Sequence, residues 1–314
     1  MPKIITITFN PALDKSTSVA ELTPDKKLNC KTPVCEPGGG GINVARAIKK
    51  LGGDATAVYL AGGYIGKKIT KMLSDELVKS IVIDIKENTR ENLVIADIKN
   101  DKQYLFDMPG PKISEQEWQS CLNTIGQIPD VEYIIASGSL PTGVPTDIFA
   151  KMSMIAQKKN ARLIVDTSGE ALKQAIKAGV YLIKPNLREL AYLVEQEDLD
   201  IESIAEMARK VIQMGKCEVI IVSMGTLGAM LVTKDLAMNI MPPAMHAEST
   251  VGAGDSLVAG IVISLVENKS LIEAVQYGVA CGTAATMHTG TELCLKDDVE
   301  NIYHKIRDHV PILL

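Results

Sequence analysis

Aromatic rings, histidines and long apolar runs are scarce in this chain of 314 residues, which has one Trp, eight Tyr, three Phe and four His. So few aromatic rings argue against base-stacking platforms or aromatic cages as the main means of recognition. The longest apolar run, Val258 to Val266, has nine residues and is interrupted by Gly260 and Ser264, so it cannot span a bilayer. We therefore expect no membrane as a partner.

Cysteine spacing, net charge and the start of the chain exclude further classes of protein. None of the six cysteines lies in a C-x-x-C pair, which argues against a zinc site, and a disulfide framework is not expected at this length. The formal net charge of −5 argues against nucleic acid as the main partner. The apolar stretch Ile4–Phe9 is too short for a signal peptide and runs directly into Asn10-Pro11. These features predict a cytoplasmic protein with reduced thiols.

The chain is instead rich in aliphatic residues and glycine, with 46% hydrophobic residues and 24 Gly. Segments with strand character alternate with segments of helical spacing, as in strand Ile4–Phe9, helix Ile42–Leu51 and strand Ala55–Ala61. This alternation predicts an α/β fold with a mostly parallel sheet covered by helices on both faces. No low-complexity linker or repeat interrupts the chain, so we expect one domain over residues 1–314.

Two stretches, at about 15–36 and 88–110, lack helical periodicity. The second predicts a hairpin that turns at Asn100-Asp101. Together they predict a small sheet that projects from the α/β body as a lid. Arg90 and the pair Lys26-Lys27 lie in these stretches, where a phosphorylated substrate would need cations, although the lysine pair is equally typical of a solvated loop.

The segment Ser249–Ser256 carries the strongest chemical signal. A G-x-G-x-x-G motif does not follow the first strand, and Gly62–Lys68 matches a P-loop only loosely, so a dehydrogenase or P-loop ATPase is disfavoured. The small residues at 252–254 let backbone N–H groups approach an anion at the start of an apolar helix. Asp255 then lies in the first turn, where it either complements the helix dipole or accepts the proton of an attacking hydroxyl. The adjoining anion cradle favours the second role and phosphoryl transfer.

A run of four glycines, Gly38–Gly41, directly precedes a predicted helix. It indicates a close approach of the backbone to another group, or a flexible loop. Asn43, in the first turn of that helix, can offer its amide to a hydroxyl. Asp14, just beyond the first strand, can accept hydrogen bonds from sugar hydroxyls, although an Asp after Asn-Pro is also typical of a turn.

Three further polar or glycine-rich segments, Ser137–Pro141, Lys184–Glu189 and Ser223–Gly228, follow predicted strands. Because ligands of parallel sheets bind beyond the carboxyl ends of the strands, we expect these segments to line one crevice. Lys184 can reach a nucleotide phosphate there. Glu189 and Asn186 can hold Mg²⁺ through water.

Together these motifs resemble the ribokinase-like PfkB family of carbohydrate kinases over nearly the whole chain. Gly38–Gly53 and Thr250–Gly260 look like its two signature regions. Asn10–Asp14, Thr89-Arg90 and Ser137–Pro141 look like the hexose-phosphate kinase branch, which includes 6-phosphofructokinases, 1-phosphofructokinases and tagatose-6-phosphate kinases. Within that branch, Glu36–Ala47 resembles most the minor 6-phosphofructokinases, since the other groups usually have Lys where this chain has Gly40.

The resemblance implies a three-layer α/β/α sandwich and ATP-dependent phosphorylation of fructose 6-phosphate at its 1-hydroxyl. It implies Asp255 as the general base and Gly252, Ala253 and Gly254 as the anion hole. The residues implied to bind the sugar phosphate are Asp14, Lys27, Gly39, Asn43, Arg90 and Ser139. The residues implied to face ATP are Lys184, Asn186, Ser223, Gly225, Gly228, Thr250, Gly278, Val279 and Thr283.

The same resemblance implies Mg²⁺ supported by Glu189 and Asn186, and a monovalent cation such as K⁺ near oxygens of Ser249 and Val251. It also implies a homodimer whose lids interlock as a β-clasp, with Lys27 acting across the interface. The chain departs from the family at Asn29, where relatives often have a second basic residue. It also departs in the loop 288–291, which is one residue shorter than in close relatives.

Two rival functions stay open. Within the family, the acceptor could be tagatose 6-phosphate or fructose 1-phosphate instead. From another class, the chain could be a non-catalytic sensor of sugar phosphates with a kinase fold. Asp255 and Lys184 argue against the sensor, because both residues suit catalysis.

Overall fold

The structure is a computed structural model that describes residues 3–288, 290, 292–308 and 312–313. Its larger sheet has ten strands in the order β14-β13-β12-β11-β10-β9-β8-β1-β4-β5. These strands are β1 (Ile4–Thr8), β4 (Thr56–Ala61), β5 (Lys79–Asp84), β8 (Tyr133–Ser137), β9 (Arg162–Asp166), β10 (Val180–Ile183), β11 (Cys217–Ser223), β12 (Ala229–Val232), β13 (Ala237–Ile240) and β14 (Ile312–Leu313).

The strands from β11 to β5 are all parallel, which confirms the predicted mostly parallel sheet. β1 and β4 are buried along their whole length, because helices cover both faces of the sheet. β12, β13 and β14 pair antiparallel at one edge and were not predicted. β12 and β13 have four residues each, too few for a recognisable period.

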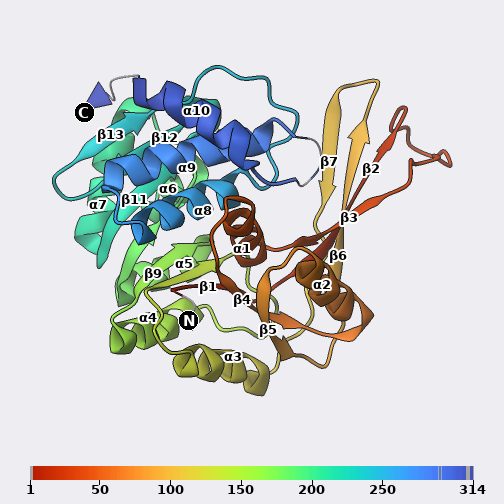
Figure 1. The fold of residues 1–314 in the computed structure, drawn as a ribbon, viewed down its shortest axis with the longest axis horizontal. Coiled ribbons are helices and arrows are strands. Elements are labelled where there is room, and N and C mark those ends of the chain that lie inside the picture. Colours follow the sequence, from red (N-terminus) through yellow and green to blue (C-terminus); the bar gives the residue numbers. More distant parts are fainter. Residues whose placement is uncertain (1–2, 289, 291, 309–311, 314) are drawn as a thin grey trace.

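Helices form one layer on each face of this sheet. The helices of one layer are α1 (Gly40–Lys50), α2 (Gly63–Asp75), α8 (Ala253–Val266), α9 (Leu271–Thr286) and α10 (Lys296–Asp308). The helices of the other are α3 (Glu115–Gln127), α4 (Ile148–Lys159), α5 (Gly169–Ala178), α6 (Leu187–Leu193) and α7 (Ile204–Met214). Figure 1 shows α8, α9 and α10 on one side of the strands and α3 and α4 on the other. This is the expected three-layer sandwich.

A second, four-stranded sheet has the order β3-β2-β6-β7 and projects beside α1 and α2 (Figure 1). Its strands are β2 (Ala12–Val19), β3 (Val34–Gly38), β6 (Arg90–Asp97) and β7 (Lys102–Phe106). The predicted hairpin is confirmed, because β6 and β7 pair antiparallel around a turn in which Asp101 has a φ of 50°. We call these four strands the small sheet.

In the part of the chain that the structure describes, no helix combines the length and the apolarity needed to cross a membrane. The most apolar long helix, α8, is buried because it packs against α1 and α9 and shares a hydrophobic core with the strands. Its burial places the first turn of α8 at a fixed position beside the carboxyl ends of the parallel strands.

Candidate active site

Asp255, in the first turn of α8, is held by side chains from two other elements. Asn43 of α1 donates its amide to Oδ2 of Asp255 at 2.9 Å, and the Ser137 hydroxyl, at the end of β8, donates to Oδ1 at 3.4 Å. α8 begins after Gly252, whose φ of 76° favours glycine. The structure therefore brings together a carboxylate, an amide and a hydroxyl that the sequence carries far apart.

The carboxyl group of Asp255 has an unusual acidity. Burial raises its pKa to about 7, and the neighbouring charge of Asp166 acts in the same direction. The hydrogen bond from Asn43 and the positive charge of Lys184 oppose this rise without cancelling it. A carboxylate with a pKa near neutral pH is matched to accepting a proton from a hydroxyl.

Lys184 provides a buried positive charge beside the start of α8. Its Nζ pairs with Oδ1 of Asp166 at 3.2 Å, and only 8% of its side chain is exposed. A methyl group added to Gly254 would lie 3.3 Å from this Nζ. Burial alone would lower the pKa of Lys184, but the carboxylates of Asp166, Glu189 and Asp255 raise it, so the group stays charged. The N–H of Ala253 donates to the carbonyl of Thr250 at 3.4 Å. Together with the N–H groups of the first helical turn, the ammonium of Lys184 forms a site for an anion.

The glycine run lets α1 begin against the end of β1. A methyl group on Gly41 would lie 2.4 Å from the carbonyl oxygen of Ile7, and Gly39 has a φ of 110°. A methyl group on Gly40 would lie 2.1 Å from the hydroxyl oxygen of Ser137. The close approach predicted for these glycines is therefore to the protein itself, and it places Asn43 within reach of Asp255.

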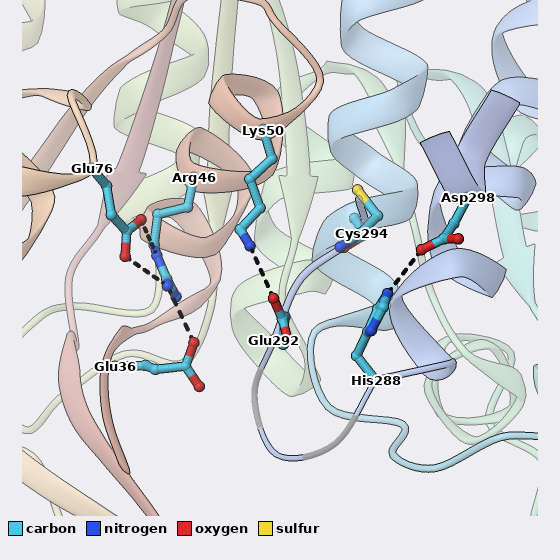
Figure 2. A network of polar contacts seen from close by, with 9 residues as sticks. Glu36, Arg46, Lys50, Glu76, His288, Glu292, Cys294 and Asp298 are labelled. Atoms are coloured by element: carbon cyan, nitrogen blue, oxygen red, sulfur yellow. Dashed lines mark hydrogen bonds and ion pairs between the residues drawn. The ribbon is translucent and has the colours of Figure 1, made fainter. Parts of the chain in front are cut away.

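Arg46 fastens α1 to the small sheet. Its Nε and Nη2 donate to the carboxylate of Glu76 at 2.7 and 2.8 Å, and its Nη1 donates to the carbonyl of Pro37 at 2.9 Å. Glu36, in β3, accepts from Nη2 at 3.3 Å. Figure 2 shows the guanidinium between the two carboxylates. Because the buried Arg46 lies one turn after Asn43, its contacts fix the helix that holds Asp255.

Asp14, in β2, lies beside β3, where the small sheet meets α1. Its Oδ1 accepts a hydrogen bond from the Asn92 amide at 3.0 Å, and a methyl group on Gly38 would lie 2.0 Å from its Oδ2. Burial raises the pKa of Asp14, while Asn92 and the charge of Arg90 oppose the rise. The carboxylate thus lies at the base of the small sheet with one oxygen already engaged.

Arg90, at the start of β6, lies beside a cavity of about 480 Å³ that Tyr64 and Met108 also line. Its guanidinium pairs with the exposed carboxylate of Asp107 and donates to the carbonyl of Met108 at 2.8 Å. Ser139 is exposed and its hydroxyl oxygen accepts a hydrogen bond from Asn10 at 3.0 Å. The side chain of Arg90 is only 9% exposed, so a phosphate group would reach its guanidinium from this cavity, beside the exposed hydroxyl of Ser139.

Lys27 is exposed on the connection between β2 and β3 and forms no hydrogen bond or ion pair that involves the described residues. Figure 1 shows this connection at the end of the small sheet, away from α8. The structure therefore does not bring Lys27 to the other predicted sugar-binding residues of the same chain. Asn29, where a basic residue is absent, is exposed on the same connection.

The residues predicted to face ATP divide into two groups. Asn186 and Ser223 form a bridge between neighbouring strand ends, and Gly225 and Gly228 follow with φ angles of 61° and 85°. Thr250 is exposed beside the start of α8.

The second group lies on α9. Gly278 packs on α8, where a methyl group would lie 2.6 Å from Ile261, and the side chain of Val279 lies in the core. Thr283 is partly exposed and donates its hydroxyl to the carbonyl of Val279 at 2.8 Å. Core packing therefore accounts for Gly278 and Val279, and Thr283 is the member of this trio with access to solvent.

The predicted Mg²⁺ residues, Asn186 and Glu189, form the capping box of α6. Oδ1 of Asn186 accepts from the backbone N–H of Glu189 at 2.9 Å, and Oε2 of Glu189 accepts from that of Asn186 at 2.8 Å. Among the described residues, no three His, Cys, Asp or Glu side chains gather as a metal cluster. The remaining oxygen lone pairs therefore fit an ion held through water and substrate phosphates, not a cage of protein ligands.

The predicted K⁺ residues lie next to the loop 288–291. The Ser249 hydroxyl donates to the carbonyl of Gly290 at 2.8 Å and accepts from the N–H of Val251 at 3.2 Å. The pairs His288–Asp298 and Lys50–Glu292, at 3.0 and 3.5 Å, hold the two ends of this segment (Figure 2). The loop predicted to be one residue shorter than in relatives includes residues 289 and 291, which lie outside the described residues.

Comparison with known proteins assigns the family. The model of the pfkB family carbohydrate kinases matches residues 5–298. The chain belongs to the PfkB family of carbohydrate kinases. It is 42% identical over 304 residues to the ATP-dependent 6-phosphofructokinase isozyme 2 of Escherichia coli, a match that covers 96% of this chain and 98% of that one. The 1-phosphofructokinase of Bacillus subtilis is less similar, at 31% identity over 92% of this chain and 95% of its own.

Solved structures of PfkB kinases superpose on this chain. The phosphofructokinase-2 of E. coli in complex with substrates and products has a TM-score of 0.93 and 41% identity, covering 97% of this chain and 99% of that one. The same enzyme in complex with potassium also has a TM-score of 0.93 and 41% identity, over 98% and 100% of the two chains. A tetrameric inhibited form has a TM-score of 0.92 and 40% identity over the same shares.

The site contains two residues that the sequence did not predict, Asp166 and Asn92. Asp166 ends β9 and pairs with Lys184, and Asn92 holds Asp14. Asp166 could have been found as a carboxylate at the carboxyl end of a predicted strand. Asn92 lies in a strand of mostly half-buried residues, where nothing in the sequence distinguishes it from a surface amide.

Proposed function

We propose that this PfkB kinase transfers the γ-phosphoryl group of ATP to the 1-hydroxyl of fructose 6-phosphate, giving fructose 1,6-bisphosphate. The observation that carries the proposal is Asp255, with a pKa near 7, at the start of α8 and beside the buried Lys184. The whole-chain similarity to 6-phosphofructokinase isozyme 2 supports fructose 6-phosphate as the acceptor, because the similarity to a 1-phosphofructokinase is lower.

In the proposed reaction, Asp255 takes the proton of the 1-hydroxyl as its oxygen attacks the γ-phosphorus. The bond from that phosphorus to the oxygen it shares with the β-phosphate breaks, and ADP leaves. The N–H groups of Gly252, Ala253 and Gly254, with the ammonium of Lys184, stabilise the charge on the transferred phosphoryl group. Asn43 and Ser137 keep the carboxylate oriented throughout.

The remaining predicted residues have supporting roles in this proposal. Mg²⁺ would neutralise charge on the phosphates of ATP, with Glu189 and Asn186 holding its water ligands. Ser249 and Val251 would offer oxygens to K⁺, a role supported by the potassium complex of the E. coli enzyme. Asp14, Gly39 and Asn43 would bind the sugar, and Arg90, Ser139 and Lys27 its phosphate. Ser223, Gly225, Gly228, Thr250 and Thr283 would surround ATP, while Gly278 and Val279 pack in the core beneath Thr283.

We further propose that two copies pair through their small sheets. Large apolar side chains are exposed there, including Val34, Ile98, Leu105 and Phe106, the first three by 59 to 60%. Pairing would cover them and would bring Lys27 of one copy to the sugar phosphate of the other, with the small sheets serving as lids. The homodimer is the smallest unit that these contacts need, and the tetrameric form of the E. coli enzyme is compatible with a pair of dimers.

A panel of acceptors tests the proposed reaction. ADP formation is measured with ATP, Mg²⁺ and either fructose 6-phosphate, tagatose 6-phosphate or fructose 1-phosphate. We expect the highest kcat/KM with fructose 6-phosphate. A higher kcat/KM with another acceptor would change the substrate and leave the chemistry in place. Binding of these sugar phosphates without ADP formation from any of them would favour the non-catalytic sensor.

A further inference from the structure

Asn10 follows β1, is only 6% exposed, and has no role in the reaction described above. Its amide Nδ2 donates to the hydroxyl oxygen of Ser139 at 3.0 Å. Its backbone carbonyl accepts from Nη2 of Arg90 at 3.2 Å. Ser139 and Arg90 lie 129 and 80 positions away in the sequence, so Asn10 links two groups that reach the site from different elements.

The amide of Asn10 is clamped in place. A methyl group on Gly110 would lie 2.1 Å from its Oδ1, so the chain passes tightly against that oxygen. Oδ1 is buried and accepts no hydrogen bond from the residues that the structure describes, and the buried Nε of Arg90 likewise has no acceptor among them. Unsatisfied buried polar atoms are costly and rare, so two in one cluster distinguish this part of the structure.

The direction of the hydrogen bond from Asn10 decides what Ser139 can do. Because the oxygen of Ser139 accepts the N–H of Asn10, its own hydrogen is free to point elsewhere. Ser139 is exposed, so that hydrogen can face solvent or a bound ligand. A hydroxyl in this state is a donor for an anion. If the oxygen of the amide faced Ser139 instead, it would take the hydroxyl hydrogen and leave only lone pairs for the ligand.

We propose that Asn10 is a positioning residue that presents the Ser139 hydroxyl and the Arg90 guanidinium as donors to the phosphate group of the sugar substrate. The inference rests on the proposed function, since it concerns the 6-phosphate of that substrate. Asn10 itself does not need to touch the substrate. Its amide orients Ser139, and its carbonyl fixes one arm of Arg90.

The isosteric variant Asn10→Asp tests the direction of this hydrogen bond. A carboxylate at position 10 has the shape of the amide but only accepts, so it would take the hydroxyl hydrogen of Ser139 and would also repel the phosphate. We expect the Kd for fructose 6-phosphate, measured by titration calorimetry without ATP, to rise by about tenfold or more in Asn10→Asp. Asn10→Ala removes the orienting donor without adding an acceptor, so its Kd should rise less. The KM for ATP should stay close to the wild-type value in both.

The order of the two variants is the deciding result. Equal Kd values for Asn10→Asp and Asn10→Ala, or tighter binding by Asn10→Asp, would overturn the proposal, because a purely structural role favours the isosteric change. Because the new charge of Asn10→Asp would itself repel the phosphate, Asn10→Ala is also compared in wild-type and Ser139→Ala backgrounds, which serves equally should Asn10→Asp fail to fold. The proposal requires its effect to shrink when the hydroxyl is absent, and an undiminished effect would refute it.

Turnover of the wild-type protein separates this proposal from the proposed function. A wild-type protein that binds fructose 6-phosphate but forms no ADP would refute the kinase reaction, while the calorimetric comparison would still decide the role of Asn10. Normal turnover with equal Kd values in the two variants would refute the role of Asn10 alone.

Discussion

The amide of Asn43 donates a 2.9 Å hydrogen bond to Asp255, a residue 212 positions further along the chain. This contact joins the first turns of α1 and α8, so the two glycine-rich segments of the sequence meet at one carboxylate. The bond favours the ionised form of Asp255 and so opposes the effect of burial on its pKa. The amide thus both orients the proposed base and keeps its carboxyl group acidic enough to ionise near neutral pH.

The pH dependence of the reaction should follow the ionisation of Asp255. Because the ionised form of Asp255 accepts the proton, kcat/KM should fall as the pH drops below about 7. Asn43→Ala removes a hydrogen bond that lowers the pKa of Asp255. In this variant the fall of kcat/KM at low pH, which we call the acidic limb, should therefore move to higher pH. Initial rates between pH 5.5 and 9, in matched ionic strength, measure the limb. A limb that stays in place in Asn43→Ala would separate the amide from the ionisation that controls the rate.

The variant Asp255→Asn should lose catalysis and gain stability. Without the base, turnover should fall by at least ~10²-fold, while ATP still binds. The wild-type carboxyl has a higher pKa folded than unfolded, so the folded state binds more protons between the unfolded value and about 7. Stability therefore declines as the pH rises through that window, and the full cost of ionising the buried group is present above it.

Asp255→Asn removes that cost, so its Tm should exceed that of the wild type at pH 8, with a smaller difference at pH 5. Calorimetric melting at the two pH values provides the measurement, and ATP binding confirms an intact site. Ser256→Ala, the adjacent change on the same helix, serves as the control for altered packing. Near-normal turnover of Asp255→Asn would remove this residue from the mechanism, and an unchanged Tm difference between the pH values would contradict the assigned pKa.

Lys184 and Asp166 should shift the acidic limb in opposite directions. The charge of Lys184 lowers the pKa of Asp255, and that of Asp166 raises it. Lys184→Met should therefore move the limb to higher pH and raise the KM for ATP, whereas Asp166→Asn should move it to lower pH. Comparison of the two variants controls for the loss of the ion pair itself, because both variants break the 3.2 Å contact between Lys184 and Asp166. Shifts in the same direction would show that the broken contact, not the charge, sets the limb.

Much of this fold can be predicted from the sequence because its signals are local. Buried parallel strands such as β1 and β4 read as short apolar runs, and the capping boxes at Ser114 and Asn186 mark helix starts. The antiparallel strands β12 and β13 have no such signal, because four mostly buried residues can belong to either kind of element.

The site is less predictable because its geometry depends on contacts between distant segments. Asp255 and Lys184 could be chosen from their place near glycines and strand ends. Asn43 and Asp166 shift the pKa values of these two groups through contacts in space, and the spacing of residues along the sequence does not reveal such contacts. The glycine run shows the same limit, since Gly40 and Gly41 make room for Ser137 and β1.

The last prediction uses the competition for Arg90. Its guanidinium pairs with Asp107, whose carboxylate is 71% exposed, and a substrate phosphate would compete for the same donors. Arg90→Ala should raise the KM for fructose 6-phosphate by about tenfold or more, with little change in the KM for ATP. Asp107→Asn should lower the KM for fructose 6-phosphate, because the guanidinium then has no competing carboxylate. Steady-state kinetics with each substrate varied in turn measures both. A selective loss of ATP affinity in Arg90→Ala would place Arg90 on the nucleotide side, and a raised KM in Asp107→Asn would mean that Asp107 orients the arginine rather than competing for it.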